Sequence, residues 1–349
     1  MGQVMRSPST TDSYTRRRFL KLLAAAAGGV TIGGGTFRAA RLLQQPLADV
    51  MVLGAASYSD DLHDLLLRGI REFPMLCARC QGAKVLLKPN LVEYHADRPV
   101  NTHPAVVVAA AEAFRALGAR EVIVAEGPGH QRDVGLLLEY SGLGQALREA
   151  DIPFVDLNLD GIGPVSLHSD HTGLGRLFLP QTLLDADLVV SMPKMKTHKW
   201  TGVTLSLKNM FGVVPGVKYG WPKNILHWRG IDQSIWDINE AVRPAFAIVD
   251  GIVGMEGNGP IDGTAVDAGV LVLGENLCAV DATTARLMGV YPERITHLAG
   301  MMEQGGAVSS ERIRQLGEAV SDRRRSFVVA PHLGMIVKRP TLLQWVSAS

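Results

Sequence analysis

Lysine, histidine and asparagine side chains gather directly after several predicted strands of this chain. Lys88-Pro89-Asn90 follows one hydrophobic run, and residues 193–198 follow another. Ligands of open α/β sheets bind beyond the carboxyl ends of the strands, so we expect these side chains at one edge of a sheet. Lys88, Lys194, Lys196 and Lys208 would there form a positive pocket suited to a carboxylate or a phosphate. Solvated loop charges are the alternative interpretation of any single run.

The same residues permit acid–base and nucleophilic chemistry. His198 lies within the lysine cluster and could act as a general base near neutral pH, or it could be a hydrogen-bonded structural histidine. A lysine beside other lysines has a lowered pKa, which makes Lys194 or Lys196 a candidate nucleophile or base. The catalytic candidates are Lys194, Lys196, His198 and Lys208, and the substrate-binding candidates are Lys88, Asn90, Thr102, His103, Asn209 and Lys223.

Two of these assignments and the metal candidates have structural alternatives. Thr102-His103 could aim backbone amides at an anion, or Thr102 could cap the helix that Pro104 begins. Asp250, Glu256 and Asp281 are candidate ligands of a divalent metal, with Glu256 in a glycine-rich loop. Asp281 could instead be a first-turn charge of a helix over residues 279–288.

Short β-branched and leucine-rich runs alternate with helical patterns, which predicts an α/β fold with a mixed, largely parallel sheet and helices on both faces. A β-hairpin is expected within residues 161–179, and residues 194–228 lack regular periodicity, as functional loops often do. Trp200, Trp221 and Trp228 in that stretch are interpreted as core residues. The predicted strands are 50–55, 84–88, 121–125, 154–156, 188–191, 247–250 and 270–273, and the early helices are 60–73, 104–117 and 134–149.

Several polar and glycine-containing motifs follow one another along the chain: Lys88-Pro89-Asn90, residues 193–198, 207–212, 219–224 and 256–260, and Val280-Asp281. This ordered set resembles that of the bacterial and archaeal family called domain of unknown function 362. The resemblance spans about residues 84–289, and it implies no established activity. Some relatives are described as iron–sulfur proteins with ferredoxin-type cysteine clusters. This chain has only three cysteines, so a four-cysteine cluster of its own is not expected.

A second likeness concerns the order of His198, Lys208, Pro215-Gly216 and His227. This order is similar to that of the nickel-pincer lactate racemase family, in which such residues hold a nicotinate-derived nickel cofactor. The likeness implies that Lys208 would tether or contact the cofactor and that His227 could bind the metal. It makes His198 a partner in proton or hydride transfer. The cofactor is thus unknown, with a divalent metal or a nickel-pincer-like group as the candidates.

Cys77 and Cys80 form a C-x-x-C pair, which could be a redox pair or a small disulfide loop in an oxidising compartment. The structural alternative is two unrelated cysteines where a helix ends before residues 84–88. A thiol-redox or cofactor-delivery accessory protein remains one functional hypothesis on this basis.

The amino-terminal segment is typical of a twin-arginine export signal. Paired arginines precede Phe19-Leu20, and a short weakly apolar run follows. A transmembrane anchor would need a longer apolar stretch. We therefore expect recognition by the twin-arginine translocase, export in the folded state and a periplasmic or other extracytoplasmic location. Contact with a membrane would occur only through an uncleaved signal.

Charge and length set the remaining expectations. Residues 1–45 are predicted to be signal and linker, and residues 46–349 a single α/β domain. Beyond residue 45 the chain is net acidic, with 33 acidic and 28 basic side chains, which argues against a nucleic-acid binder. The expected function is that of an enzyme acting on an anionic small molecule. A non-catalytic anion-binding protein is the main alternative.

Overall fold

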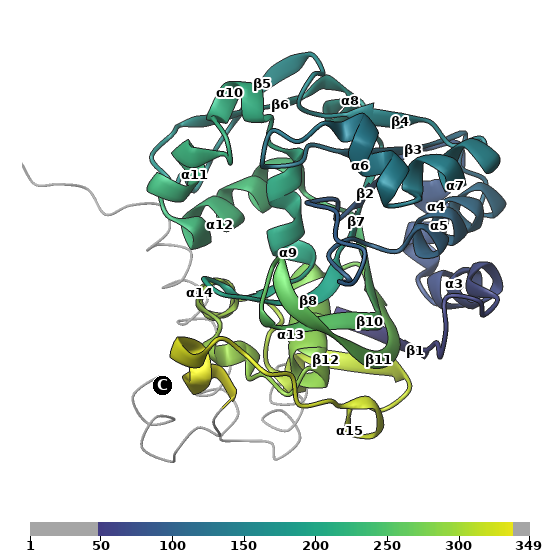
Figure 1. The fold of residues 1–349 in the computed structure, drawn as a ribbon, viewed down its shortest axis with the longest axis vertical. Helices are drawn as coiled ribbons and strands as arrows, with labels where there is room; N and C mark the ends of the chain where they lie inside the picture. The colour runs from purple at the N-terminus through teal and green to yellow at the C-terminus, as the bar shows by residue number, and fades with distance from the viewer. Residues whose placement is uncertain (1–47, 338–349) are drawn as a thin grey trace, which may run out of the picture. The chain divides into compact units, whose positions relative to one another are not determined.

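A ten-stranded sheet forms the centre of the residues that the computed structural model describes, 48–337 (Figure 1). Its strands are β1 (Ala48–Gly54), β2 (Lys84–Pro89), β3 (Glu121–Glu126), β4 (Phe154–Asp156), β7 (Leu188–Met192), β8 (Lys194–His198), β9 (Gly202–Thr204), β10 (Phe246–Asn258), β11 (Asp262–Gly274) and β12 (Ile313–Gly317). The main order is β12-β1-β11-β10-β7-β2-β3-β4, while β8 pairs with β10 and β9 with β8. Strands β10, β7, β2, β3 and β4 run parallel, whereas β11 is antiparallel to both of its neighbours.

Helices follow most strands and return the chain to the start of the sheet. The longer ones are α3 (Leu62–Arg71), α5 (Pro104–Ala116), α12 (Ile231–Val242), α13 (Leu277–Leu287) and α14 (Thr296–Glu303). The shorter ones are α4 (Pro74–Cys80), α6 (Val134–Tyr140), α7 (Leu143–Glu149), α8 (Gln181–Leu184), α9 (Ser206–Asn209), α10 (Gly216–Tyr219), α11 (Asn224–Trp228) and α15 (Val320–Arg323). A separate antiparallel hairpin, β5 (Ile162–Ser166) and β6 (Arg176–Pro180), matches the hairpin expected from the sequence.

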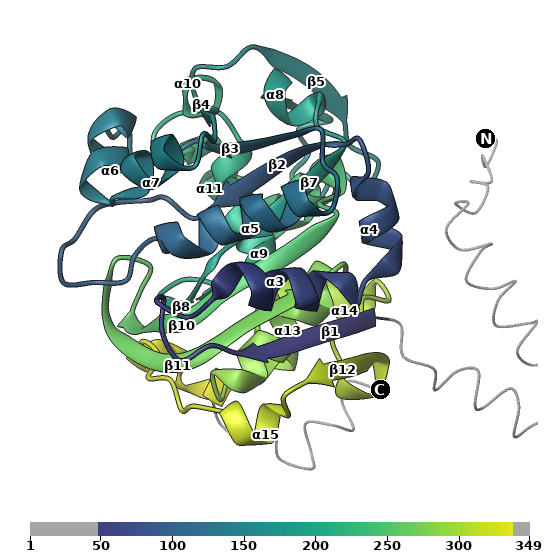
Figure 2. The same ribbon diagram turned by 90° about the vertical axis from the view of Figure 1, so that its right-hand side faces the viewer.

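Alternate residues of the strands enter two hydrophobic cores, one on each face of the sheet. On β2, Leu86 packs into the core shared with α9, α12 and α13, whereas Val85 and Leu87 pack into the core shared with α3, α4 and α5. Figures 1 and 2 show these helix groups on opposite sides of the sheet. Strands covered on both faces need apolar side chains throughout, which accounts for the unbroken hydrophobic runs of β2 and β7. The predicted fold class is confirmed.

Several predicted element boundaries differ from the structure; the strand expected over residues 270–273, for example, begins at Asp262. The helix expected over residues 134–149 is broken into α6 and α7, because Gly142 has a φ of +72° that no continuous helix allows. The strand expected over residues 247–250 continues to Asn258 and pairs with β11 past a bulge between Gly251 and Val253. The glycines of this long hairpin obscure the alternating pattern by which strands are recognised.

The predicted export signal lies outside the described residues. Within residues 48–337, no helix is long and apolar enough to cross a membrane. All of these residues belong to one compact unit.

Candidate functional site

A cavity of about 200 Å³ lies beyond the carboxyl ends of β2 and β3, where the sheet topology favours ligand binding. Loops after β2 and β3 form one side, and β8, α9 and α11 contribute the others. Its polar and aromatic lining residues are Lys88, Asn90, Glu126, His130, Lys196, His198, Lys199, Trp200, Thr204, Lys208, Asn209, Phe211, Lys223 and His227. Three of the four lysines that the sequence predicted to converge therefore line one pocket, and Lys194 does not.

The Lys88 ammonium is completely committed to protein acceptors. It pairs with the buried Glu126 carboxylate and donates to the Pro89 carbonyl at 2.9 Å and to Asn209 Oδ1 at 3.0 Å. An ammonium has three hydrogens to donate, and all three are used. Burial lowers the pKa of Lys88, and the charge of Glu126 opposes that shift. Lys88 thus fixes the floor of the pocket and has no hydrogen left for a ligand.

Lys194 also has one carboxylate and two other acceptors around its ammonium, but it lies outside the pocket. It pairs with the buried Asp250 carboxylate and donates to the Tyr58 hydroxyl at 2.9 Å and the Val253 carbonyl at 3.2 Å. Asp250 lies opposite Lys194 on the neighbouring strand, so the ion pair joins β8 to β10. The assignment of Lys194 as a catalytic residue is not supported by its position, because it lies outside the pocket with every donor used.

Lys223 is a buried lysine that has no carboxylate partner within residues 48–337. Its ammonium donates to three backbone carbonyls, those of Gly127 at 2.8 Å, Phe211 at 2.9 Å and Gly212 at 3.0 Å. Burial lowers the pKa of Lys223 to about 7. Its three bonds tie the loop after β3 to the segment that follows α9, so this residue, predicted to bind substrate, organises the pocket wall.

Lys208 is different, because its ammonium makes no hydrogen bond to any residue within 48–337. It lies over the Phe211 ring, 4.0 Å from the ring centroid, and the side chain is partly buried. Burial and the positive charge of Lys88 lower the pKa of Lys208 to about 8, while Glu126 opposes the shift. Lys208 is therefore a cation that lines the pocket with its donors unused.

His198 cannot serve as the general base that the sequence predicted. Its Nδ1 accepts hydrogen bonds from the backbone amides of Trp200 at 3.1 Å and Thr201 at 3.2 Å. Burial, followed by the charges of Lys208 and Lys196, holds the pKa of His198 well below its usual value, so the ring is neutral. A neutral ring whose Nδ1 accepts must carry its proton on Nε2. His198 is consequently a hydrogen-bond donor to the pocket.

His227 has the opposite tautomer. Its Nδ1 lies 3.1 Å from the Lys223 carbonyl oxygen, which can only accept, so the ring proton is on Nδ1. Burial lowers the pKa of His227 and keeps the ring neutral, which leaves a lone pair on Nε2. The ring packs edge-to-face against Trp200 and Phe211, with centroid distances of 6.0 and 5.7 Å. His227 is thus a proton acceptor in the same pocket.

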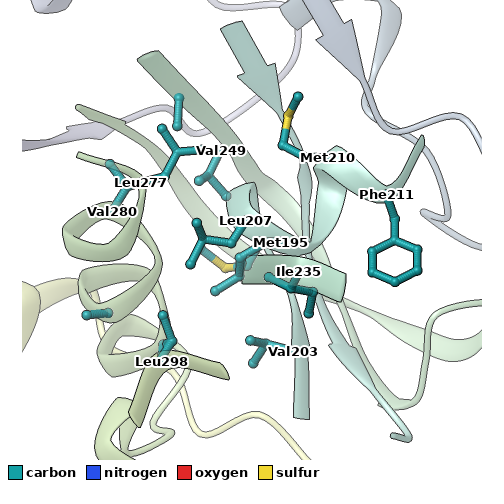
Figure 3. Packing of buried hydrophobic residues seen from close by; sticks show 14 of the residues in the cluster. Met195, Val203, Leu207, Met210, Phe211, Ile235, Val249, Leu277, Val280 and Leu298 are labelled. Atoms are coloured by element: carbon teal, nitrogen blue, oxygen red, sulfur yellow. The ribbon is translucent and has the colours of Figure 1, made fainter. Parts of the chain in front are cut away.

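Asp281 caps the amino terminus of α9, the helix that carries Lys208. Its carboxylate accepts hydrogen bonds from the Ser206 amide at 2.7 Å, the Leu207 amide at 3.0 Å and the Ser206 hydroxyl. These groups form the amino terminus of α9, which has no other cap. Figure 3 shows Leu207, Met210 and Phe211 among the apolar residues that pack around this segment. Burial raises the pKa of Asp281 to about 6, against the effect of these bonds.

The structure does not bring the four predicted metal ligands together. Asp250 is paired with Lys194, Asp281 caps α9, and Glu256 accepts from the Val328 amide at 2.8 Å. His227 lines the pocket without any of them. Residues 48–337 contain no group of three or more His, Cys, Asp or Glu side chains that could hold a metal ion. Each acid is engaged by a partner distant in sequence, which the local pattern did not reveal.

Thr102 and His103, predicted to bind substrate, act in the framework instead. The Thr102 hydroxyl donates to the Met192 carbonyl at 2.6 Å and accepts from the backbone N–H of Asn90 at 2.9 Å. His103 caps α5 through Nδ1 and stacks on Tyr58, and its amide donates to Asp250. Neither residue lines the pocket. The alternative, that Thr102 caps this helix, is wrong as well, because the capping residue is His103.

Asn90 and Asn209 do line the pocket. Asn209 is engaged on both sides of its amide, by the Lys88 ammonium and by Ser191. Asn90 Oδ1 and Thr204 Oγ1 are buried atoms without a hydrogen-bond partner among the described residues. Such orphan atoms are uncommon in folded proteins and mark places where a ligand group could bind.

Glu126, His130 and Trp200 also line the pocket, although none of them was among the predicted site residues. Glu126 directly follows the strand predicted over residues 121–125, and this position at the strand's carboxyl end could have identified it. Trp200 is 61% exposed and Trp228 is 80% exposed, so the interpretation of these two tryptophans as core residues is wrong, whereas Trp221 is half-buried.

The cysteines show no sign of thiol activation. Cys77 and Cys80 lie on α4 as free thiols, and burial raises the pKa of both, for Cys80 to about 11. Reactive thiols require the opposite shift. The structure therefore favours the structural interpretation of this pair.

Comparisons with known proteins find a family and several relatives. A model of the family described as "Domain of unknown function (DUF362)" matches residues 85–286. A thylakoid-associated protein of Synechocystis sp. is 30% identical over 233 residues, which cover 64% of this chain and 68% of that protein.

Two solved structures give weaker likenesses. A lactate racemase apoprotein from Thermoanaerobacterium thermosaccharolyticum is 16% identical with a TM-score of 0.39, and the match covers 64% of this chain and 55% of that one. A protein from Thermotoga maritima is 13% identical with a TM-score of 0.31, over 55% of this chain and 50% of that one. The chain thus spans little more than half the length of the racemase.

Replacing the carboxylate that caps α9 should destabilise the protein. In Asp281→Asn, one oxygen is exchanged for an amide that faces backbone donors, which leaves a buried N–H without an acceptor. We expect the free energy of unfolding to fall by about 1–3 kcal/mol in urea titrations. Asp185→Asn, at an exposed position, is the control and should change little. Equal stability of the two variants would contradict the capping role.

The lowered pKa of Lys208 should appear in the pH dependence of stability. Between about pH 8 and pH 10, the unfolded lysine binds a proton that the folded one releases, so stability should rise with pH. Lys208→Met removes this contribution. The free energy of unfolding of the unmodified protein should therefore increase across this range relative to the variant. Parallel curves would show that the Lys208 pKa is ordinary.

Proposed function

This chain belongs to the family described as "Domain of unknown function (DUF362)", and we propose that it is an enzyme that binds an anionic small molecule in the pocket beyond β2 and β3. One observation carries the proposal: the Lys208 ammonium lines the pocket without a hydrogen-bond partner among residues 48–337. A carboxylate or phosphate oxygen would supply the charged acceptor that this ammonium lacks.

The charge of the pocket supports an anionic ligand. Among the described residues, its lining includes Lys88, Lys199, Lys208 and Lys223, against the single carboxylate of Glu126. Glu126 is already paired with Lys88. Buried positive charge without an acidic partner lowers the pKa of the lysines and is relieved when an anion binds. We infer that ligand binding restores the charged form of Lys208.

The two histidines supply complementary functions around such a ligand. The His198 Nε2–H can donate to a ligand oxygen and stabilise charge that develops there. The His227 Nε2 lone pair can accept a proton from the ligand. A donor and an acceptor that are both neutral at physiological pH favour catalysis over simple capture, because a capture site for an anion gains nothing from a lone pair.

The pocket also has residues that would contact the nickel-pincer-like cofactor implied by the sequence likeness. His227 could bind a metal through Nε2, and Lys208 could contact an anionic group of the cofactor. His198 does not fit as a ligand, because its Nε2 carries the proton. With no group of three metal-ligating side chains in residues 48–337, the metal would be held mostly by the organic group. Such a cofactor would supply hydride transfer when bound.

We further propose export by the twin-arginine translocase, which rests on the sequence of residues 15–35. Arg16→Lys combined with Arg17→Lys should leave the protein in the cytoplasm, because the receptor reads the arginine pair. Arg6→Lys, outside the motif, should not. Cell fractionation with immunodetection measures the outcome, and equal export of both variants would rule out this route.

Anion binding is tested directly by thermal unfolding and calorimetry with inorganic phosphate and with oxalate. We expect at least one of them to stabilise the protein. Lys208→Met should weaken its binding about tenfold to a hundredfold, the effect of losing a charged hydrogen bond. The exposed Lys218→Met is the matched control and should bind normally. Affinity should also fall above about pH 8, where Lys208 loses its proton.

The enzyme and binding hypotheses separate at His227. His227→Gln keeps a polar side chain but has no basic nitrogen, so it should preserve anion affinity and abolish turnover in a screen of small carboxylates and phosphates. A protein that binds anions but turns over none of the screened compounds would favour the binding hypothesis. No stabilisation by any anion would contradict both.

A further inference from the structure

The number of acceptors around each buried lysine nitrogen differs within this structure. Lys88, Lys194 and Lys223 each donate to three protein acceptors, which is the full capacity of an ammonium. Lys196 donates to only two, the carbonyls of Val100 at 2.8 Å and Pro260 at 3.2 Å. Its third position has no partner among the described residues.

Two acceptors are the number that a neutral amine requires. An amine has two hydrogens and one lone pair, so both carbonyl bonds survive when the third proton is absent. The side chain of Lys196 is completely buried, it has no carboxylate partner within residues 48–337, and it lines the pocket. Burial and the charges of Lys194, Lys208 and Lys88 hold the pKa of Lys196 well below its usual value. Lys196 therefore has a lone pair at the position that no protein group fills.

We propose that Lys196 forms an imine with the carbonyl group of a small aldehyde or ketone whose carboxylate or phosphate is bound by Lys208. This inference rests on the proposed anion site and adds the substrate class, a carbonyl compound with an anionic group. The different surroundings of Lys196 and Lys208 give the two side chains different roles. Lys208, with a pKa of about 8, supplies the charge, and Lys196 supplies the nucleophile.

The covalent step balances without any other reactant. The Lys196 nitrogen bonds to the carbonyl carbon, and the carbonyl C–O bond breaks. Both amine hydrogens leave with that oxygen as water, and uptake of one proton from solvent converts the imine to an iminium. The iminium keeps one N–H for the Val100 carbonyl and releases the longer bond to Pro260. The His198 Nε2–H can polarise the carbonyl oxygen as the nitrogen attacks.

Three other lysines that line the pocket can be compared with Lys196. Lys88 and Lys223 line the same cavity, but three protein acceptors surround each nitrogen and leave no open position for a carbonyl carbon. Lys199 also lines the cavity, but it lies over the Trp200 ring, 5.4 Å from the centroid, and is only partly buried. The proposal therefore predicts reaction at one lysine among several neighbours.

Imine formation is tested by reductive trapping on the purified full chain. The protein is incubated near pH 7 with cyanoborohydride and one of three aldehydes: glyoxylate, glycolaldehyde phosphate or uncharged glycolaldehyde. Intact mass gives the extent of modification, and peptide mapping of the unmodified sequence gives its position. We expect Lys196 to be modified first, and about tenfold faster with a charged aldehyde than with glycolaldehyde, as one charged hydrogen bond would produce. The two charged aldehydes distinguish carboxylate from phosphate recognition.

Variants complete the test. Lys208→Met should remove the preference for charged aldehydes while Lys196 stays reactive, and Lys218→Met should behave as the unmodified protein does. Because position is read from the unmodified chain, the result stands even if Lys196→Met does not fold. Adducts confined to other lysines, or none at Lys196, would overturn the imine. If phosphate or oxalate still stabilises the protein in that case, the anion site survives without it.

Discussion

A buried ammonium must find three acceptors or give up its proton, and this requirement organises the carboxyl edge of the sheet. Lys88 and Lys194 meet it with one carboxylate each, and those ion pairs join neighbouring strands. Lys223 meets this requirement with three backbone carbonyls, one in the loop after β3 and two in the segment that follows α9. The lysines that remain, Lys196 and Lys208, face the cavity with positions unfilled. The lysines available to a ligand are therefore those whose hydrogen-bonding positions are not all filled by protein acceptors.

The framework in turn limits the backbone around it. At Gly212 any side chain would collide with the Glu126 carboxylate and the Lys88 ammonium, so the segment after α9 can approach this ion pair only as glycine. The short α9 has its amino terminus capped by Asp281 from α13, so Lys208 and Asn209 are positioned by a carboxylate distant in sequence. The residues matched by the family model, 85–286, include all of these parts.

Much of this arrangement could be predicted from the sequence, and the limits of that prediction have physical causes. Hydrophobic runs followed by Lys88 or Glu126 placed the strands and their polar ends correctly. Lys194 and Lys196 are two residues apart on one strand, which predicts similar surroundings. A register shift separates them, because Lys194 lies opposite Asp250 and Lys196 opposite Met255. The tautomer of His198 depends on two amides in the following turn, and no residue pattern encodes their direction.

The opposite tautomers of His198 and His227 have a stereochemical consequence. One wall of the cavity donates a hydrogen bond, another accepts one, and Lys208 supplies a cation, so a small ligand meets three contacts that are chemically distinct. Three different contacts on the wall of a cavity define a handedness when a ligand can approach them from one side only. A compound and its mirror image therefore cannot satisfy all three in the same way, and the pocket has the means to discriminate between enantiomers.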